Sequence, residues 1–151
     1  CKLDDIDNDG VPNINDNCPN EAGDKEFGGC PKLPISLSNF LNNNSEIFFG
    51  FDSFVINEDQ NIRLLNLSEL LKEYLHIKIY IDGYTSFEGE IDYNMILSKN
   101  RSKSVKESLI SKGINYDRLE TRAYGESSPK YQNSPLSERK KNRRVKISII
   151  N

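Results

Sequence analysis

The sequence predicts an α+β domain in which a four-stranded mixed sheet carries helices on one face, preceded by a short loop-rich module. Two observations favour this fold class. Four short apolar or alternating stretches are separated by two stretches with helical periodicity. An acidic segment that contains every cysteine of the chain stands before the first of them. The expected order of elements is β-α-β-α-β-(α)-β, which gives an α+β sandwich.

Four strands are expected in the body of the chain. Residues 47–51 are short and aromatic, and they are bounded by polar residues. Residues 77–82 and 145–149 alternate between apolar and polar side chains, and residues 118–124 alternate less regularly. A period of two is typical of a strand with one buried face.

Two helices are expected between these strands. Apolar residues at helical spacing mark the first helix at Ile62, Leu65, Leu67, Leu70, Leu71, Tyr74 and Leu75. The same spacing marks the second at Tyr93, Ile96, Leu97, Val105, Leu109 and Ile110, and Gly113 ends it. Further along, Pro129 and Pro135 predict a long loop over residues 126–142, with a short helix from Ser137.

Charge divides the 151 residues into parts. Residues 1–30 hold eight acidic and two basic residues, whereas residues 31–151 hold 15 acidic and 18 basic ones. We therefore expect an acidic module over residues 1–31, a polar connector over 32–45 and a domain over 46–151. The basic excess of the domain is too small to indicate nucleic acid. No apolar run reaches the roughly 20 residues that span a bilayer, and no signal peptide is visible, so we expect a mature form or a fragment.

Three cysteines, Cys1, Cys18 and Cys30, all lie in the acidic module. Cysteines in a loop-rich segment without histidine favour disulfide bonding and an oxidising compartment. A zinc site is the alternative, but the sole histidine, His76, is distant in sequence and is expected at a helix end. Because three is an odd number, one cysteine has no disulfide partner among the other two.

The acidic module contains a candidate site for a hard cation. Oxygen ligands occur at positions 1, 3, 5 and 12 of a loop that has Gly10 at position 6. Calcium takes about six to eight oxygen ligands, and a glycine lets the backbone turn around it. Pro12 and the missing flanking helices do not fit an EF-hand, and a solvated acidic linker is the alternative, although its carboxylates would repel one another. The expected ligands are four carboxylates and one backbone carbonyl: Asp5, Asp7, Asp9, Asp16 and Val11.

The pattern DxDxDGxxxxxDxCP resembles a thrombospondin type 3 repeat over residues 4–19, and the resemblance continues through Gly-Gly-Cys-Pro at 28–31. It implies a calcium-wrapped module with almost no apolar core and a disulfide between Cys18 and Cys30. Cys1 is then either the closing cysteine of a preceding repeat or the lipid-modified first residue of a bacterial lipoprotein.

An arginine on the apolar face of the second helix is the candidate binding residue. Asn94, Leu97 and Arg101 follow one another at helical spacing, and Thr85 and Ser86 lie just past a strand end. Backbone N–H groups are free at such a strand end, which makes it a common ligand site. A buried guanidinium needs an anion. Arg101 would therefore hold either a protein carboxylate, from Glu88 or Asp52, or a carboxylate of a ligand.

The motifs GYTS, YN, LSxxR, YGE and NRRVKI occur in order, and residues 46–150 are similar to the OmpA-like peptidoglycan-binding domain. The resemblance implies that Arg101 takes a carboxylate of the diaminopimelate in the stem peptide. Ser86 stands where that family usually has Asp, so Asp52 is the best substitute acid and Glu88 the next. Arg143 and Arg144 would also line the pocket.

The resemblance also implies a place for the protein in the cell. It would anchor an outer-membrane protein or lipoprotein to peptidoglycan at the periplasmic face of the outer membrane, through a part not present here or a lipid on Cys1. We expect no catalysis, because Ser102, Ser104 and Ser108 have no acid or base pattern around them. The alternatives are a protein-docking module of a secretion or motility complex, which Ser86 favours, and an enzyme acting on the wall.

Overall fold

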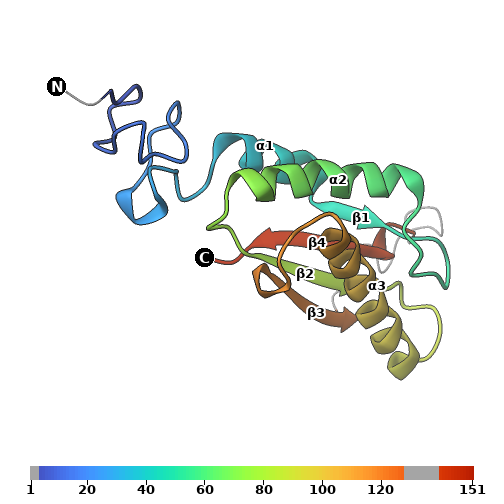
Figure 1. Cartoon of the computed structure of the whole chain (residues 1–151). Helices are drawn as coiled ribbons and strands as arrows, with labels where there is room; N and C mark the ends of the chain where they lie inside the picture. Colours follow the sequence, from blue (N-terminus) through green and yellow to red (C-terminus); the bar gives the residue numbers. More distant parts are fainter. Residues whose placement is uncertain (1–3, 128–139) are drawn as a thin grey trace.

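The computed structural model describes residues 4–127 and 140–151 of the chain (Figure 1). Cys1, the loop expected around Pro129 and Pro135, and the short helix expected from Ser137 therefore lie outside the described residues. In the described part of the chain, no helix is both long enough and apolar enough to cross a membrane.

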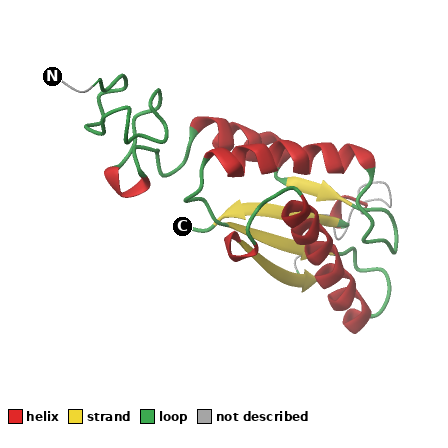
Figure 2. Cartoon of the chain, in the orientation of Figure 1, coloured by secondary structure: helices red, strands yellow, loops and turns green. Residues whose placement is uncertain are grey.

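The sheet contains the four expected strands, β1 (Glu46–Phe48), β2 (Ile79–Tyr84), β3 (Leu119–Gly125) and β4 (Arg144–Ile149), in the spatial order β1-β4-β2-β3 (Figure 2). β2 pairs with β3 in parallel, whereas β4 runs antiparallel to both β1 and β2. The prediction of a mixed four-stranded sheet is confirmed. β4 is the last strand in sequence, yet it lies between the first two.

Three α-helices occur in the described residues, α1 (Ile35–Asn44), α2 (Glu58–Glu73) and α3 (Ile91–Ser111). The last two agree with the predicted helices. The Asn57 side chain accepts the N–H of Gln60 at 3.0 Å and so caps α2. Three short 3₁₀ turns, η1 (Lys25–Phe27), η2 (Tyr116–Arg118) and η3 (Lys140–Asn142), complete the described elements.

The segment 32–45, expected as a polar connector, contains α1. Leu37 of this helix is completely buried in the domain core, and α1 contacts α2. The apolar residues of the segment are separated by asparagines and serines, so its helical pattern is weak in the sequence. Packing against α2 therefore stabilises a helix that the local helix propensity does not predict.

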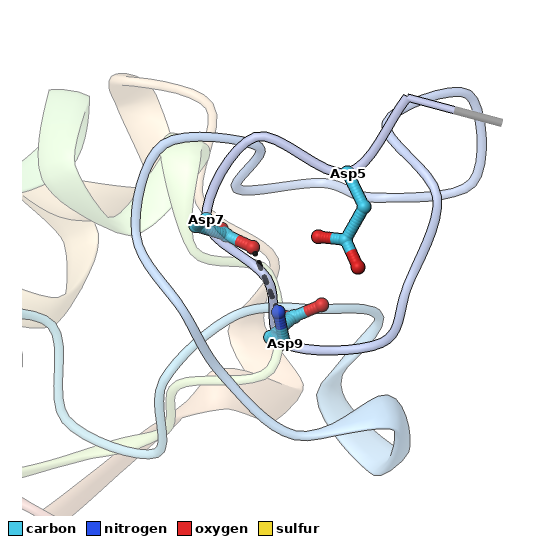
Figure 3. Close-up of side chains that lie close together, drawn as sticks. All are labelled: Asp5, Asp7 and Asp9. Atoms are coloured by element: carbon cyan, nitrogen blue, oxygen red, sulfur yellow. Dashed lines mark hydrogen bonds between the residues drawn. The ribbon is translucent and has the colours of Figure 1, made fainter. Parts of the chain in front are cut away.

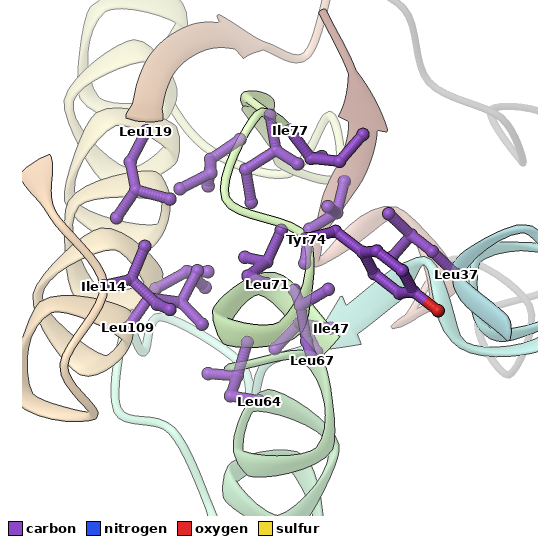
Figure 4. Close-up of a cluster of buried hydrophobic side chains, with 14 of the residues drawn as sticks. Leu37, Ile47, Leu64, Leu67, Leu71, Tyr74, Ile77, Leu109, Ile114 and Leu119 are labelled. Atoms are coloured by element: carbon purple, nitrogen blue, oxygen red, sulfur yellow. The ribbon is translucent and has the colours of Figure 1, made fainter. Parts of the chain in front are cut away.

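The core lies between the sheet and the helices (Figure 4). Ile79 and Ile81, which face the same side of β2, belong to one buried cluster with Leu37 of α1, Leu67 of α2 and Val105 of α3. All three helices therefore pack against the same face of the sheet, as predicted for α2 and α3. Alternate residues of a strand point to opposite faces, which explains the single apolar face.

Gly83 permits the closest approach between α3 and the sheet. A Cβ built at this position would lie 2.0 Å from the backbone oxygen of Ser98 in α3. No side chain larger than hydrogen fits there without a shift of the helix. The glycine therefore sets the height of α3 above the end of β2, next to Arg101.

The acidic module is made of loops and η1, and a disulfide joins Cys18 to Cys30 with a Cα–Cα distance of 5.0 Å. The predicted disulfide is thereby confirmed. Both cysteines are buried and belong to the same apolar cluster as Tyr74. His76 is more than a helix-end residue, because its ring stacks on Phe27 at 4.8 Å and its Nε2 lies 3.2 Å from the carbonyl oxygen of Pro31.

Candidate functional site

A pocket of about 220 Å³ opens beside the ends of β1 and β2 and the N-terminal half of α3. The β1–α2 loop, the β2–α3 loop, α3 and the residue just before β4 all contribute to it. Seven residues that the sequence analysis named as candidates line this pocket: Asp52, Ser86, Glu88, Asn94, Leu97, Arg101 and Arg143. Thr85 and Arg144, which were also predicted, do not line it.

Arg101 lies at the base of the pocket and is completely buried. Its guanidinium donates to the backbone oxygens of Ser53 at 2.8 Å, Tyr84 at 3.1 Å and Gly50 at 3.2 Å. These are neutral acceptors, and the structure shows no ion pair between Arg101 and a carboxylate of the described residues. The alternative of a clasping protein carboxylate therefore has no support in the described part of the chain.

The charge of Arg101 is poorly compensated. Burial is the main cause that lowers its pKa to about 10, and the nearby positive charge of Arg143 lowers it further, whereas Asp52 opposes the shift. A guanidinium has more N–H donors than the three carbonyl bonds use. Arg101 can thus still donate to an anion that enters the pocket, and such a bond would be charge-assisted.

Asp52 supplies negative charge at the mouth of the same pocket. Its backbone is left-handed, with φ of 49°, which is uncommon for a residue other than glycine. The hydroxyl of Tyr93, in the first turn of α3, donates to Asp52 Oδ1. This hydrogen bond is the main cause that raises the pKa of Tyr93.

Sequence reasoning missed the contribution of Tyr93, because helical periodicity assigned it to the apolar face of α3. It also missed Phe51, which is exposed and lines the pocket beside Asp52. The guanidinium of Arg143 lies 5.9 Å from the Phe51 ring centroid. No periodic signal could have placed either aromatic residue at the pocket, since Phe51 belongs to the β1–α2 loop and the Tyr93 hydroxyl meets Asp52 of the same loop.

Asn94 stabilises the β2–α3 loop by hydrogen bonds to its backbone. Its Nδ2 donates to the backbone oxygens of Ser86 and Glu88 at 3.3 and 3.1 Å, and to Glu126 Oε2 at 2.9 Å. The donors of this amide are therefore used inside the protein. Ser86 and Glu88 are held at the pocket wall by their backbones, and Ser86 itself is buried.

Thr85 is buried just past the end of β2. Its N–H donates to the backbone oxygen of Gly125 at 2.8 Å, and its hydroxyl oxygen has no hydrogen-bond partner within residues 4–127 and 140–151. Thr85, which was predicted as a site residue, is not among the residues that line the pocket.

Arg143 and Arg144 diverge because neighbouring residues of extended chain point to opposite sides. Arg143 lines the pocket. Arg144 stacks over the ring of Tyr84 at 4.3 Å, and its Nε lies 3.4 Å from the carboxylate of Glu46. Arg144 was predicted to line the pocket, but the structure places its side chain on the face of the sheet opposite the core, outside the pocket lining.

The acidic module brings its aspartates together as expected. Asp5, Asp7 and Asp9 each present a carboxylate oxygen, and these oxygens all lie within 4.8 Å of one another (Figure 3). Asp16 is close enough to add to the repulsion that raises the pKa of Asp7, although burial is the larger cause of that shift. Val11 is buried, and its N–H donates to Asp9 Oδ1 at 2.7 Å.

Three of these carboxylates share one arrangement. One oxygen of each accepts a backbone N–H, which Gly10 donates to Asp5 at 3.1 Å, Asp9 to Asp7 at 3.2 Å and Cys18 to Asp16 at 2.8 Å. The second oxygens are buried and have no hydrogen-bond partner in the described residues: Asp5 Oδ1, Asp7 Oδ2 and Asp16 Oδ2. Buried acceptors without a partner are costly, so these oxygens fit a hard cation.

The chain thus contains an α+β domain with a pocket at its strand ends. The buried arginine of this pocket has no carboxylate partner in the described residues. A family model described as the OmpA family matches residues 48–143, and the chain belongs to this family. The described mixed sheet with its helices carries the greater part of the matched segment.

Two curated relatives extend this result. A peptidoglycan-associated lipoprotein of Brucella melitensis is 32% identical over 114 residues, covering 75% of this chain and 68% of the relative. Outer membrane porin F of Pseudomonas aeruginosa is 29% identical over 148 residues, covering 96% of this chain. This chain spans 41% of the length of the porin.

A solved structure has the same fold. The crystal structure of the peptidoglycan-associated lipoprotein from Burkholderia pseudomallei matches with a TM-score of 0.69 and 23% identity. The match covers 74% of this chain and 99% of the other.

Proposed function

We propose that this chain binds peptidoglycan without catalysis and anchors an outer-membrane protein or lipoprotein to the cell wall, at the periplasmic face of the outer membrane. The observation that carries this proposal is a completely buried guanidinium, Arg101, at the base of an open pocket with no carboxylate partner in the described residues. The similarity to the Brucella relative, which is named a peptidoglycan-associated lipoprotein, also supports this proposal.

The ligand would be the diaminopimelate of the stem peptide. Its free end carries a carboxylate, which Arg101 would bind, and an ammonium group, which the acidic wall of the pocket would bind. Charges of both signs in one pocket complement a zwitterion better than they complement a simple anion.

The serines of α3 support a role without catalysis. Ser102 and Ser104 donate their hydroxyls to the backbone oxygens of Lys99 and Asn100 at 3.0 Å, and Ser108 accepts from Lys112 Nζ at 2.8 Å. A nucleophilic serine requires a base within hydrogen-bond reach. In these hydrogen bonds the three serines meet backbone carbonyls and an ammonium group, none of which is such a base.

Calorimetric titration of a diaminopimelate-containing stem peptide tests the binding proposal. We expect the parent to bind and Arg101→Ala to lose about 1.5–3 kcal/mol of binding free energy, the size of a hydrogen bond to a charged group. Because Arg101 is buried, circular dichroism must show that the variant is folded. The exposed Asp52→Asn change provides a second variant with little risk to the fold, and it should also weaken binding. A folded parent that does not bind would overturn the proposal and favour the protein-docking alternative.

We propose further that the acidic module is a thrombospondin type 3-like repeat that binds Ca²⁺ through Asp5, Asp7, Asp9, Asp16 and the carbonyl of Val11. The three buried oxygens without partners support this assignment. A bound cation would remove the repulsion among the carboxylates and stiffen the module into a spacer before the wall-binding domain.

Thermal unfolding with Ca²⁺ or Mg²⁺ tests the calcium proposal. A ligand that binds only the folded state stabilises it by about 2.7 kcal/mol at a hundredfold excess over Kd. We expect Ca²⁺ to raise the Tm of the parent and to have a much smaller effect on Asp16→Asn. Asp24→Asn is the matched control, since Asp24 is an exposed aspartate of the same module outside the cluster. Equal responses of the two variants would refute the assignment.

A further inference from the structure

We propose that Tyr93 is a positioning residue that holds the carboxylate of Asp52 as the partner of the ligand's ammonium group. The pair would make the pocket select stem peptides whose diaminopimelate end has a free amino group beside its carboxylate. This inference rests on the proposed function and assigns the ammonium partner within the same pocket.

The charges of the pocket are arranged on two sides. Arg101 and Arg143 supply positive charge, and Asp52 and Glu88 supply negative charge. Ser86 lies in the wall with a neutral side chain. A ligand ammonium therefore has two candidate partners in this pocket, Asp52 and Glu88.

The carboxylate of Asp52 is better positioned than that of Glu88 to bind a ligand ammonium. The Tyr93 hydroxyl donates to Asp52 Oδ1 across 41 residues of sequence, from α3 to the β1–α2 loop. This bond engages one carboxylate oxygen and leaves the other for a ligand. Left-handed residues such as Asp52 are strained and gather at ligand sites, where the surrounding structure holds them.

Glu88 is held differently. Its backbone oxygen accepts from Asn94, which fixes the chain but not the carboxylate. The described residues supply no hydrogen bond to the Glu88 carboxylate, whereas Tyr93 supplies one to the carboxylate of Asp52. Ordering a free side chain opposes binding, whereas a carboxylate already held by a hydroxyl avoids that cost.

Tyr93 itself is suited to position an acid rather than to bind the cation. It is 49% exposed and stands at the mouth of the pocket, so the ligand can enter beside it. Its hydroxyl proton is directed at Asp52. Replacing Tyr93 by phenylalanine keeps the ring and removes only the hydrogen bond.

Two peptides with the same sequence provide the test. One has a free amino group at the distal end of diaminopimelate, and the other is acetylated there. Calorimetry should show that the parent prefers the free amine by about tenfold or more, as expected for a charge-assisted contact. Asp52→Asn should abolish the preference. Tyr93→Phe should reduce it severalfold, because the affinity for the free-amine peptide falls more than the affinity for the acetylated one.

Two further variants sharpen the result. Glu88→Gln examines the rival acid and should keep the preference. Adding Ser86→Asp to the Asp52→Asn variant should restore the preference, because Ser86 lines the same pocket. A merely structural role of Tyr93 would change the affinities for both peptides equally and leave their ratio intact.

The outcomes separate this inference from the proposed function. If the parent binds neither peptide, the proposed function fails. If the parent binds both equally, the function stands and the selectivity inference fails. If Glu88→Gln removes the preference and Asp52→Asn does not, Glu88 is the ammonium partner and the role assigned to Tyr93 is wrong.

Discussion

The hydroxyl of Tyr74 donates to Glu21 Oε2 at 3.2 Å and joins the helical domain to the acidic module across 53 residues of sequence. The other carboxylate oxygen of Glu21 accepts the N–H of Ile35, the first residue of α1, at 2.9 Å. A carboxylate at a helix N-terminus satisfies a free donor and interacts favourably with the helix dipole. One side chain of the acidic module therefore holds both α1 and the end of α2.

Glu21→Gln should loosen this junction. The change keeps the shape and removes the charge, so we expect the free energy of unfolding to fall by about 1–2 kcal/mol. Denaturant unfolding measures the loss, and proteolysis of the acidic module should become faster. Glu26→Gln, an exposed change in the same module, is the control. Equal stability of the two variants would show that the junction contributes nothing.

Arg118→Met should destabilise the domain strongly. The Arg118 guanidinium donates to the backbone oxygens of Leu71 at 2.7 Å, Tyr74 at 2.9 Å and Ile77 at 2.9 Å, at the C-terminal end of α2 and beyond it. Methionine keeps most of the apolar stem and leaves those oxygens without this donor, for a loss of about 3 kcal/mol in chemical denaturation. Arg63→Met removes a single bond, to the oxygen of Glu46 at 3.2 Å, and should cost less. The reverse order would contradict this account.

Gly83→Ala should displace α3 and weaken ligand binding. The added methyl would overlap the Ser98 backbone oxygen, and overpacking of this kind costs about 1–3 kcal/mol. Gly50→Ala is the control, because a Cβ there would meet only the Cβ of Ser53, at 3.8 Å. Thermal unfolding and peptide titration should both separate the two variants. An unchanged Gly83→Ala protein would mean that the helix moves at no cost.

Thr85→Val should leave stability unchanged or raise it slightly. The buried hydroxyl oxygen of Thr85 has no partner in the described residues, so replacing it by a methyl group removes an unsatisfied polar atom. Stem-peptide affinity should also stay the same, since Thr85 does not line the pocket. A marked loss of affinity would show that the Thr85 hydroxyl takes part in binding.

The elements of the domain could be predicted because their periods are local properties. Alternation located β2 and β4, and the spacing of apolar residues located α2 and α3. α1 could not be predicted in this way. Its helix depends on Leu37, which is buried in the core, and on the contact that Glu21 makes with Ile35.

Pocket residues on α3 could be predicted from helical spacing. Contacts that depend on the path of a loop could not. Arg101, Asn94 and Leu97 follow from the helical spacing of α3. Tyr93 fits the same helical spacing, but that spacing does not predict its partner. Its hydroxyl donates to Asp52 because the β1–α2 loop lies beside the first turn of α3. The family motif alone suggested that Arg144 lines the pocket, whereas the alternation of β4 places Arg144 on the face opposite Val145 and Ile147.

The sequence by itself determined the strands, α2 and α3, the cysteine-rich acidic module and the identity of the buried arginine, because each depends on neighbours along the chain. The tertiary structure decided which groups accept hydrogen bonds from this arginine. Two carbonyls of the β1–α2 loop, those of Gly50 and Ser53, and the carbonyl of Tyr84 at the end of β2 accept from Arg101, and no carboxylate of the described residues pairs with it. The physical reason is that hydrogen-bond partners 17 to 51 residues apart are brought together only when the sheet and α3 pack.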